Sequence, residues 1–186
     1  MDCRTGVCAY GRVPVLGSGP CPARFTLIGE APGRQELQQG RPFVGPAGKL
    51  LDQYLETAGI LRSECRILNT VGCVDLDREV KKPTPGEIAA CKSRLMTEIE
   101  EAQSRIVVLL GGVALQHFYP GLSISRARGK PRSWQGRIVI PTFHPAASLP
   151  YRSPEIAIDI IRDLELARSL EGGSIWQIEK SEETKV

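Results

Sequence analysis

The stretch Arg24-Phe25-Thr26-Leu27-Ile28-Gly29 decides the fold class, because it predicts a short buried strand that ends at a glycine turn. A glycine-rich loop follows this strand, and residues 47–58 then repeat apolar side chains at helical spacing. The apolar face of that helix consists of Leu50, Leu51, Tyr54 and Leu55. A strand, a loop and a helix in this order indicate the first unit of an α/β fold.

The same alternation continues along the rest of the chain. The patterns predict further strands over residues 65–71, 105–110 and 137–140, and helices over residues 84–102 and 156–170. Strands that are separated by helical crossovers favour a parallel sheet with helices on both faces. We therefore predict a three-layer α/β/α sandwich around a central four-stranded, mainly parallel sheet. Ligands of such folds bind at the carboxyl ends of the strands.

Composition points to one folded domain. The 186 residues are 41% hydrophobic and 24% charged, close to the average of globular proteins. We expect a single domain over residues 1–170 and a short charged tail over residues 171–186. The net charge of +3 permits a nucleic-acid partner without requiring one. The sequence has no apolar run of about 18 residues and no secretory signal at its N-terminus, so we expect a cytoplasmic protein with no membrane association.

The loop after the first strand carries the densest chemistry. It reads Gly29-Glu30-Ala31-Pro32-Gly33, then Glu36, then Gly40-Arg41-Pro42-Phe43-Val44-Gly45-Pro46-Ala47-Gly48. Backbone N–H groups of such a loop could hold an anion, beside two carboxylates and one aromatic ring. On loop chemistry alone, an ordinary turn with solvated glutamates is an equal alternative.

The full string resembles the opening motif of the family 4 uracil-DNA glycosylases, the iron–sulfur branch of that superfamily. The resemblance continues in the family's order through residues 67–73, 83–91, 109–111, 128–129 and 142–145, and it covers roughly residues 3 to 165. It implies a DNA repair enzyme that flips uracil out of DNA and hydrolyses its N-glycosidic bond, leaving an abasic site. Uracil-containing DNA, double- or single-stranded, is the implied partner.

Two residues suit the charges of this reaction. Cleavage builds positive charge on the sugar and negative charge on the leaving uracil, so the site needs a group that orients water and a donor that stabilises an anion. The resemblance gives Glu30 the first role and His144 the second. A lone histidine at a strand end is more often a satisfied core residue. The following Pro145 and the family position favour the catalytic role.

A flipped base is read by stacking and by hydrogen bonds to its Watson–Crick edge. The resemblance makes Phe43 the stacking aromatic and Asn69 the amide that donates to O4 and accepts from N3–H, with Ala31 as a further substrate contact. Glu36 matches the acidic side chain that lies against uracil C5 and excludes the thymine methyl. Taken alone, these residues would be a core aromatic, a turn residue and a solvated acid. The chain departs from the family at Leu37, where an acidic residue is usual.

Four cysteines are predicted to hold a [4Fe–4S] cluster. Cys73 and Cys91, with seventeen residues between them, match the family's C-terminal ligand pair. We assign Cys3 and Cys8 as the N-terminal pair, although four residues separate them where the family usually has two. Cys21 is an alternative ligand. Spacing alone would also allow a tetrahedral zinc site, and the resemblance is what favours iron–sulfur.

A basic stretch and a later loop are the candidates for contacts with DNA. The stretch contains Arg126, Arg128, Lys130, Arg132 and Arg137, with Trp134 among them. We assign phosphate contacts to Arg128, Lys130 and Arg132, against the alternative of a solvated face. Leu149 and Tyr151 fall where the superfamily inserts a wedge into the duplex, and either could enter the base stack.

Two other interpretations remain beside the hydrolytic enzyme. One is a non-catalytic iron–sulfur DNA-binding module of the same fold, which the joint presence of Glu30, Phe43, Asn69 and His144 disfavours. The other is the superfamily branch that traps its abasic product through a histidine. The loop over residues 129–134 has no histidine, which disfavours trapping. We expect a monomer, and replication or repair proteins are open as further partners.

Overall fold

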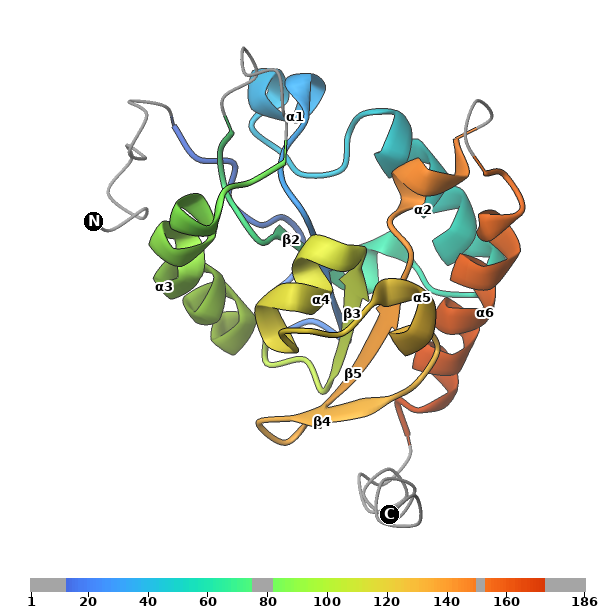
Figure 1. Cartoon of the computed structure of the whole chain (residues 1–186). Helices are drawn as coiled ribbons and strands as arrows, with labels where there is room; N and C mark the ends of the chain where they lie inside the picture. The colour runs from blue at the N-terminus through green and yellow to red at the C-terminus, as the bar shows by residue number, and fades with distance from the viewer. Residues whose placement is uncertain (1–12, 75–81, 150–152, 173–186) are drawn as a thin grey trace.

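A five-stranded sheet with strand order β2-β1-β3-β5-β4 forms the centre of the protein (Figure 1). The structure is a computed structural model that describes residues 13–74, 82–149 and 153–172. The strands are β1 (Phe25–Gly29), β2 (Cys65–Asn69), β3 (Ile106–Leu110), β4 (Arg132–Trp134) and β5 (Arg137–Thr142). The pairs β1–β2, β1–β3 and β3–β5 are parallel, so the carboxyl ends of four strands meet at one edge of the sheet.

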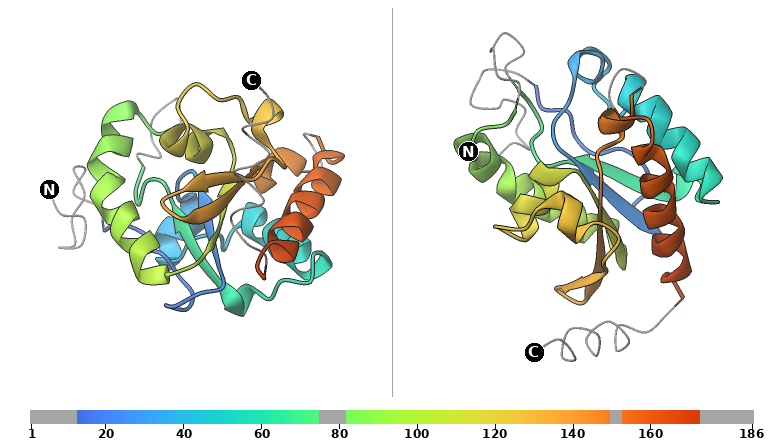
Figure 2. Two further views of the ribbon diagram at one scale, coloured as in Figure 1. Left: turned by 90° about the horizontal axis from the view of Figure 1, so that it is seen from below. Right: turned by 45° about the vertical axis from the view of Figure 1, so that its right-hand side comes forward.

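Helices cover both faces of this sheet (Figures 1 and 2). The helices of the described chain are α1 (Arg34–Gln39), which lies beyond the carboxyl ends of the strands, α2 (Pro46–Thr57), α3 (Pro85–Ala102), α4 (Gly112–Phe118), α5 (Ile124–Ala127) and α6 (Ile156–Ser169), with short 3-10 helices η2 (Arg62–Glu64) and η3 (Pro145–Ser148). Helices α2 and α6 pack on one face, while α3, α4 and α5 pack on the other. The predicted three-layer α/β/α sandwich is therefore confirmed.

The alternation of side chains along each strand builds the two halves of the core. Leu27, Ile67 and Val108 point to the face of α2 and α6. Ile28 and Leu68 point to the opposite face, where α3 and α4 cover them. All five residues of β1 are buried, because this strand lies between two parallel neighbours and under helices on both sides.

The predicted number of four strands is wrong, because β4 adds a fifth. This strand pairs antiparallel with β5 at the edge of the sheet, with Arg132 opposite Val139. It is only three residues long and its side chains are half-buried, so it has no apolar run that would predict a strand. Its sequence is typical of a basic loop instead.

The segment before β1 runs along the outer side of β2. Val15 N–H donates to the carbonyl oxygen of Gly72 at 2.7 Å, and Ser18 exchanges two backbone hydrogen bonds with Ile67. Ala23 N–H then donates to Ala102 near the opposite end of the sheet. The described N-terminal segment therefore starts beside the loop that follows β2 and ends beside the start of β1. Among the helices that the structure describes, none combines the length and the apolar character that a membrane span requires.

Candidate active site

A cavity of about 440 Å³ opens at the carboxyl ends of the parallel strands. The predicted substrate residues lie around it: its lining includes Ala31, Glu36, Phe43, Asn69, His144 and Leu149. Asn69 is the last residue of β2, and His144 follows β5 by two residues. Because these strands are parallel members of one sheet, residues 75 positions apart in sequence meet at the same edge.

The ring of Phe43 forms one wall of this cavity. Its backbone lies in the left-handed region with φ 53°, and its side chain is only 6% exposed. Arg62 holds the loop in this conformation, since its Nη2 donates to the carbonyl oxygens of Phe43 at 3.1 Å and Pro42 at 3.3 Å. Arg62 is itself paired with Asp52 on α2. The constrained backbone fixes an aromatic face toward the cavity.

His144 lies against that ring with a defined arrangement of its nitrogens. The ring centroids of Phe43 and His144 are 5.6 Å apart and the rings are stacked at 28°. His144 Nδ1 accepts a hydrogen bond from Ala146 N–H at 3.1 Å. A neutral imidazole that accepts at Nδ1 carries its proton on Nε2, so Nε2 is a donor.

The loop that carries His144 is tied to α2. Ser148 Oγ donates to the carbonyl oxygen of Pro145 at 2.7 Å, and the hydroxyls of Ser148 and Tyr54 are hydrogen-bonded at 2.7 Å. Both hydroxyls are buried. This chain of bonds fixes η3, and with it the position of His144, against the helix that follows the Phe43 loop.

Asn69 presents an unpaired buried oxygen. The residue is 3% exposed, and its Oδ1 has no hydrogen-bond partner in the described part of the chain. A buried polar atom without a partner is costly, and in a cavity it indicates a ligand that supplies the missing bond. Gly29, which is in register with Asn69, leaves room for this amide and for the Phe43 ring.

Glu36 lines the cavity and also accepts hydrogen bonds from the loop that carries Phe43. Its Oε1 accepts from Val44 N–H at 2.9 Å and from Gly45 N–H at 2.7 Å. These bonds place the carboxylate at the N-terminus of α2, where negative charge is favourable. Glu36 therefore supports the Phe43 loop as well as facing the cavity.

Glu30 faces a second hollow instead of the first. This hollow has a volume of about 350 Å³, and its lining includes Glu30, Lys82, Gly112, Gln116 and Ser123. The adjacent Ala31 lines the first cavity, so the loop after β1 contributes to both hollows. Burial raises the pKa of the Glu30 carboxyl, and the charge of Lys82 opposes that rise. The two predicted catalytic residues, Glu30 and His144, therefore line different hollows.

Cys73 follows β2 by four residues, and Cys91 lies on α3. Both are buried, at 3% and 4% exposed, and Cys91 packs with Val71 and Val74. Leu37, at the position where the chain departs from the family, packs against this same cluster. Two buried thiols from separate segments fit half of a four-cysteine cluster site. Among the described residues there is no group of three or more side chains that could hold a metal ion.

The remaining cysteines differ in where they lie. Cys3 and Cys8 are outside the described residues. Cys21 is exposed and precedes Ala23, whose N–H bonds the carbonyl of Ala102 at the far end of α3 from Cys91. Cys65 is buried at the start of β2, and burial raises the pKa of its thiol to about 12. Cys65 and Cys73 are therefore separated by the length of β2.

The predicted DNA contacts differ in their surroundings. Arg128 is engaged within the protein: it donates to Asp163 at 2.7 and 3.0 Å and to the carbonyl oxygen of Asp159 at 3.0 Å. Lys130 is exposed, and the guanidinium of Arg132 lies over the ring of Tyr119. Leu149 lines the first cavity. Tyr151 lies outside the described residues.

Comparison with known families identifies the superfamily to which the chain belongs. A family model described as the uracil DNA glycosylase superfamily matches residues 16–165 of this chain. The chain belongs to the uracil DNA glycosylase superfamily. The match spans the strand ends that carry Asn69 and His144 and the loop that carries Phe43. The predicted family resemblance is confirmed.

Curated members of the superfamily are similar over most of the chain. A type-4 uracil-DNA glycosylase of Thermotoga maritima is 42% identical over 158 residues, which cover 83% of this chain and 81% of that protein. One from Archaeoglobus fulgidus is 36% identical, over 73% of this chain and 71% of that protein. One from Pyrobaculum aerophilum is 32% identical, over 84% of this chain and 83% of that protein.

Sequence reasoning missed three residues that shape this superfamily site. Gly29, Arg62 and Arg94 do not line the cavity, but they set the positions of Phe43 and Asn69. Arg94 had a signal in the sequence, because it falls on the apolar face of its helix, next to Leu95. A charged residue on a buried face must be paired. Arg62 had no comparable signal.

Proposed function

We propose that this protein is a monofunctional uracil-DNA glycosylase that hydrolyses the N-glycosidic bond of a flipped-out uracil and leaves an abasic site. The observation that carries this proposal is Asn69, which lines the cavity beside Phe43 and His144 and whose buried Oδ1 has no hydrogen-bond partner among the described residues. A cavity with an aromatic wall and a buried amide suits a planar base with a polar edge. The type-4 names of similar proteins agree with this activity.

Base recognition falls to Phe43 and Asn69. The fixed ring of Phe43 stacks on the uracil, and the amide of Asn69 donates to O4 and accepts from N3–H. Cytosine presents the opposite hydrogen-bonding pattern at these two positions, so it would leave both Asn69 groups unpaired. Glu36 and Ala31 complete the pocket around the base, with Glu36 at the position that excludes a thymine methyl.

His144 and Glu30 act on the charges that develop during cleavage. The Nε2–H of His144 donates to the uracil oxygen as negative charge builds there, and its partner Ala146 holds the ring in the donor tautomer. Glu30 orients the attacking water from the side of the second hollow, and its carboxylate also stabilises the cationic sugar. The neighbouring Lys82 favours the ionised form of Glu30 that this role needs, because its charge lowers the pKa of that carboxyl.

Cys73 and Cys91, with Cys3 and Cys8, would hold a [4Fe–4S] cluster. The segment at Val15 bonds Gly72, so the N-terminal part of the described chain lies next to Cys73, which supports the choice of Cys3 and Cys8 over Cys21. When bound, the cluster would tie the N-terminal segment to the loop after β2 and to α3. No catalytic step needs it.

Lys130 and Arg132 are proposed to contact DNA phosphates, and Leu149, at the rim of the base cavity, to enter the stack. Arg128 would act by fixing this region to α6 through Asp163, which is 3% exposed. Binding through phosphates predicts that affinity falls as the salt concentration rises. Replacing one phosphate-binding side chain should reduce the slope of log affinity against log salt by about one.

A single-turnover assay on a uracil-containing oligonucleotide, followed by alkali and gel separation, tests the function. Wild-type protein should cleave at the uracil, while Glu30→Gln and His144→Ala should be slowed by about 10²-fold or more with nearly unchanged DNA binding. Lys130→Ala is the control and should weaken binding with less effect on the rate at saturating enzyme. Tight binding of uracil-DNA without any cleavage by wild-type protein would favour the non-catalytic module instead.

A further inference from the structure

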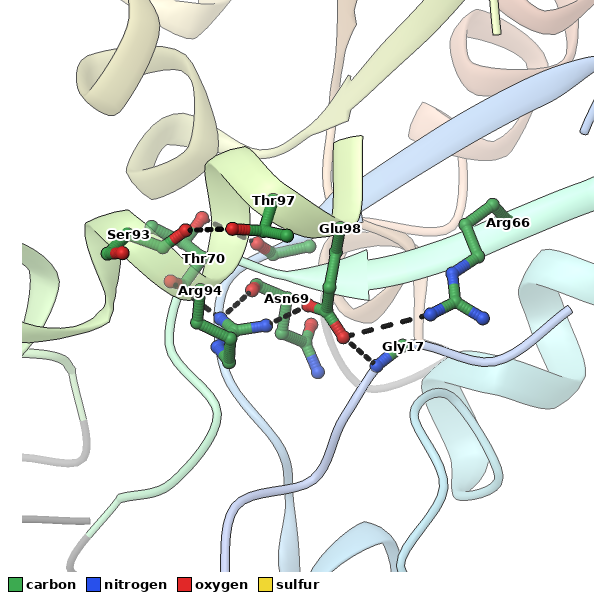
Figure 3. Close-up of polar contacts among 9 residues, drawn as sticks. Gly17, Arg66, Asn69, Thr70, Ser93, Arg94, Thr97 and Glu98 are labelled. Atoms are coloured by element: carbon green, nitrogen blue, oxygen red, sulfur yellow. Dashed lines mark hydrogen bonds and ion pairs between the residues drawn. The ribbon is translucent and has the colours of Figure 1, made fainter. Parts of the chain in front are cut away.

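A buried ion pair between Arg94 and Glu98 contacts the backbone of Asn69 (Figure 3). Arg94 and Glu98 are neighbours on α3, 2% and 5% exposed, and their charged groups are in contact. Arg94 Nη2 donates to the carbonyl oxygen of Asn69 at 2.7 Å and to that of Thr70 at 3.1 Å. The guanidinium therefore bridges α3 and the carboxyl end of β2.

Glu98 connects the same arginine to the N-terminal segment. Its Oε1 accepts from Gly17 N–H at 2.6 Å and lies 3.8 Å from Arg66 Nη2. Figure 3 shows this carboxylate between Arg94 on one side and Gly17 and Arg66 on the other. Three segments that are distant in sequence meet at one buried pair of charges.

Stability alone does not account for this pair. Removing two charges from water is expensive, and well-packed apolar residues of similar volume are often as stable or more stable. Arg94 Nε also has no hydrogen-bond partner in the described part of the chain. What the pair provides is geometry, because the planar fork of arginine places one nitrogen on two adjacent carbonyl oxygens and a second nitrogen on a carboxylate.

Arg94 fixes the backbone at Asn69, the residue proposed to bind the base. Thr70 N–H bonds the carbonyl of Gly29 at 2.9 Å, and Arg94 bonds the carbonyl oxygens of Asn69 and Thr70, which lie on either side of the Thr70 Cα. The Asn69 Oδ1, by contrast, has no partner of its own among the residues described. The backbone bonds therefore fix the Cα from which this amide extends.

We propose that Arg94, oriented by Glu98, is a positioning residue that holds the Asn69 amide in the position required to bind the base. This rests on the proposed role of Asn69. Arg94 touches neither substrate nor cavity, and it acts through the two carbonyl oxygens at the end of β2. A lysine at this position keeps the charge, but its single nitrogen cannot replace both Nη1, which contacts Glu98, and Nη2, which bonds the two carbonyl oxygens.

The test measures single-turnover excision of uracil at saturating enzyme. Arg94→Lys should slow the rate constant by about tenfold or more, because small displacements of a positioned group cost large factors in rate. Affinity for abasic-site DNA should stay unchanged. A partly unfolded preparation contains less active enzyme, which raises the total concentration needed for saturation but leaves the rate constant at saturation unchanged. Glu100 lies on the same helix as Arg94 and forms an exposed ion pair with Arg137 of β5. Glu100→Gln removes this pair, is the matched control and should behave as wild type.

A second variant covers the case in which Arg94→Lys fails to fold. Arg94→Met combined with Glu98→Gln removes both charges and keeps an acceptor for Gly17 N–H, and it should show the same loss of rate. Either folded variant excising uracil at the wild-type rate would overturn the proposal.

A double-mutant cycle separates this proposal from the role of Asn69 itself. In an Asn69→Ala background, Arg94→Lys should have little further effect, because the group that it positions is gone. Equal slowing in both backgrounds would show that Arg94 acts elsewhere and would overturn the proposal. A wild-type rate for Asn69→Ala alone would instead remove Asn69 as the base reader.

Discussion

Gly29→Ala should disable the base pocket without touching a proposed catalytic group. A Cβ at this position would lie 2.6 Å from Asn69 Oδ1 and 2.6 Å from the Phe43 ring, whereas ordinary contact begins at 3.4 Å. One or both side chains must therefore move by about 0.8 Å. A misplacement of roughly 1 Å can cost about 10²-fold in rate, and overpacking of this kind costs about 1–3 kcal/mol of stability.

The assay is single-turnover excision of uracil at saturating enzyme, together with thermal unfolding. Gly29→Ala should be slowed by roughly 10²-fold at a temperature where it remains folded. Gly172→Ala is the control, since a Cβ there meets nothing within 4 Å, and it should behave as wild type. If folded Gly29→Ala excised uracil at the wild-type rate, the contact between Gly29, Asn69 and Phe43 would have no part in reading the base.

Three further predictions address Asn69, the buried carboxyl of Glu30 and the cysteine ligands of the cluster. Asn69→Asp should weaken uracil recognition by on the order of 1–3 kcal/mol, because a carboxylate cannot donate to O4; an unchanged excision rate would contradict this. Burial raises the pKa of Glu30, so its contribution to stability is present at low pH and is lost as pH rises through that pKa. Glu30→Gln should therefore raise the melting temperature at pH 8 more than at pH 4. Lys82→Gln should move the acid limb of the pH–rate profile to higher pH. Equal melting shifts or an unmoved limb would refute the proposed role of the Glu30 carboxylate. Cys73→Ala should lose iron and sulfide on analysis of anaerobically purified protein while Cys21→Ala retains them, and the reverse result would exchange the ligands.

The central strands were predictable because their burial is complete. β1 and β3 read as continuous apolar runs, and each has five buried residues between parallel neighbours. The long helices followed from helical spacing of apolar residues, as in α2. β4 was missed because a three-residue edge strand buries too little to leave a pattern, and its pairing with β5 depends on the turn between them.

The site was predictable to the extent that it depends on strand ends. Asn69 and His144 follow buried strands, and a parallel sheet brings such positions to one edge. The second hollow was not predictable, because Glu30 and Ala31 are adjacent in sequence and yet face different cavities. That division depends on α4, whose seven residues gave no clear helical signal.

Hydrogen bonds to the backbone explain most of what sequence patterns left out. Arg62 and Arg94 bond carbonyl oxygens, and every residue has one, so the partner leaves no trace in the sequence. Each arginine reaches the carbonyl from a different secondary-structure element, 19 residues from Phe43 and 25 residues from Asn69. Such a bond becomes visible only when the fold fixes which segments are neighbours.

The two arginines hold Phe43 and Asn69, the proposed base-reading residues, in different ways, and the difference follows from the backbone. Phe43 sits at φ 53°, a conformation that a residue with an aromatic side chain rarely adopts, so Arg62 has to offset local strain. Asn69 ends a regular strand, and its backbone needs no such support, yet Arg94 is held there by a buried carboxylate at considerable desolvation cost. A stacking platform tolerates small displacement because stacking is not strongly directional, whereas a hydrogen bond weakens steeply with angle. The pair with the larger desolvation cost, Arg94 and Glu98, therefore supports Asn69, where a displacement would weaken hydrogen bonds to the base most.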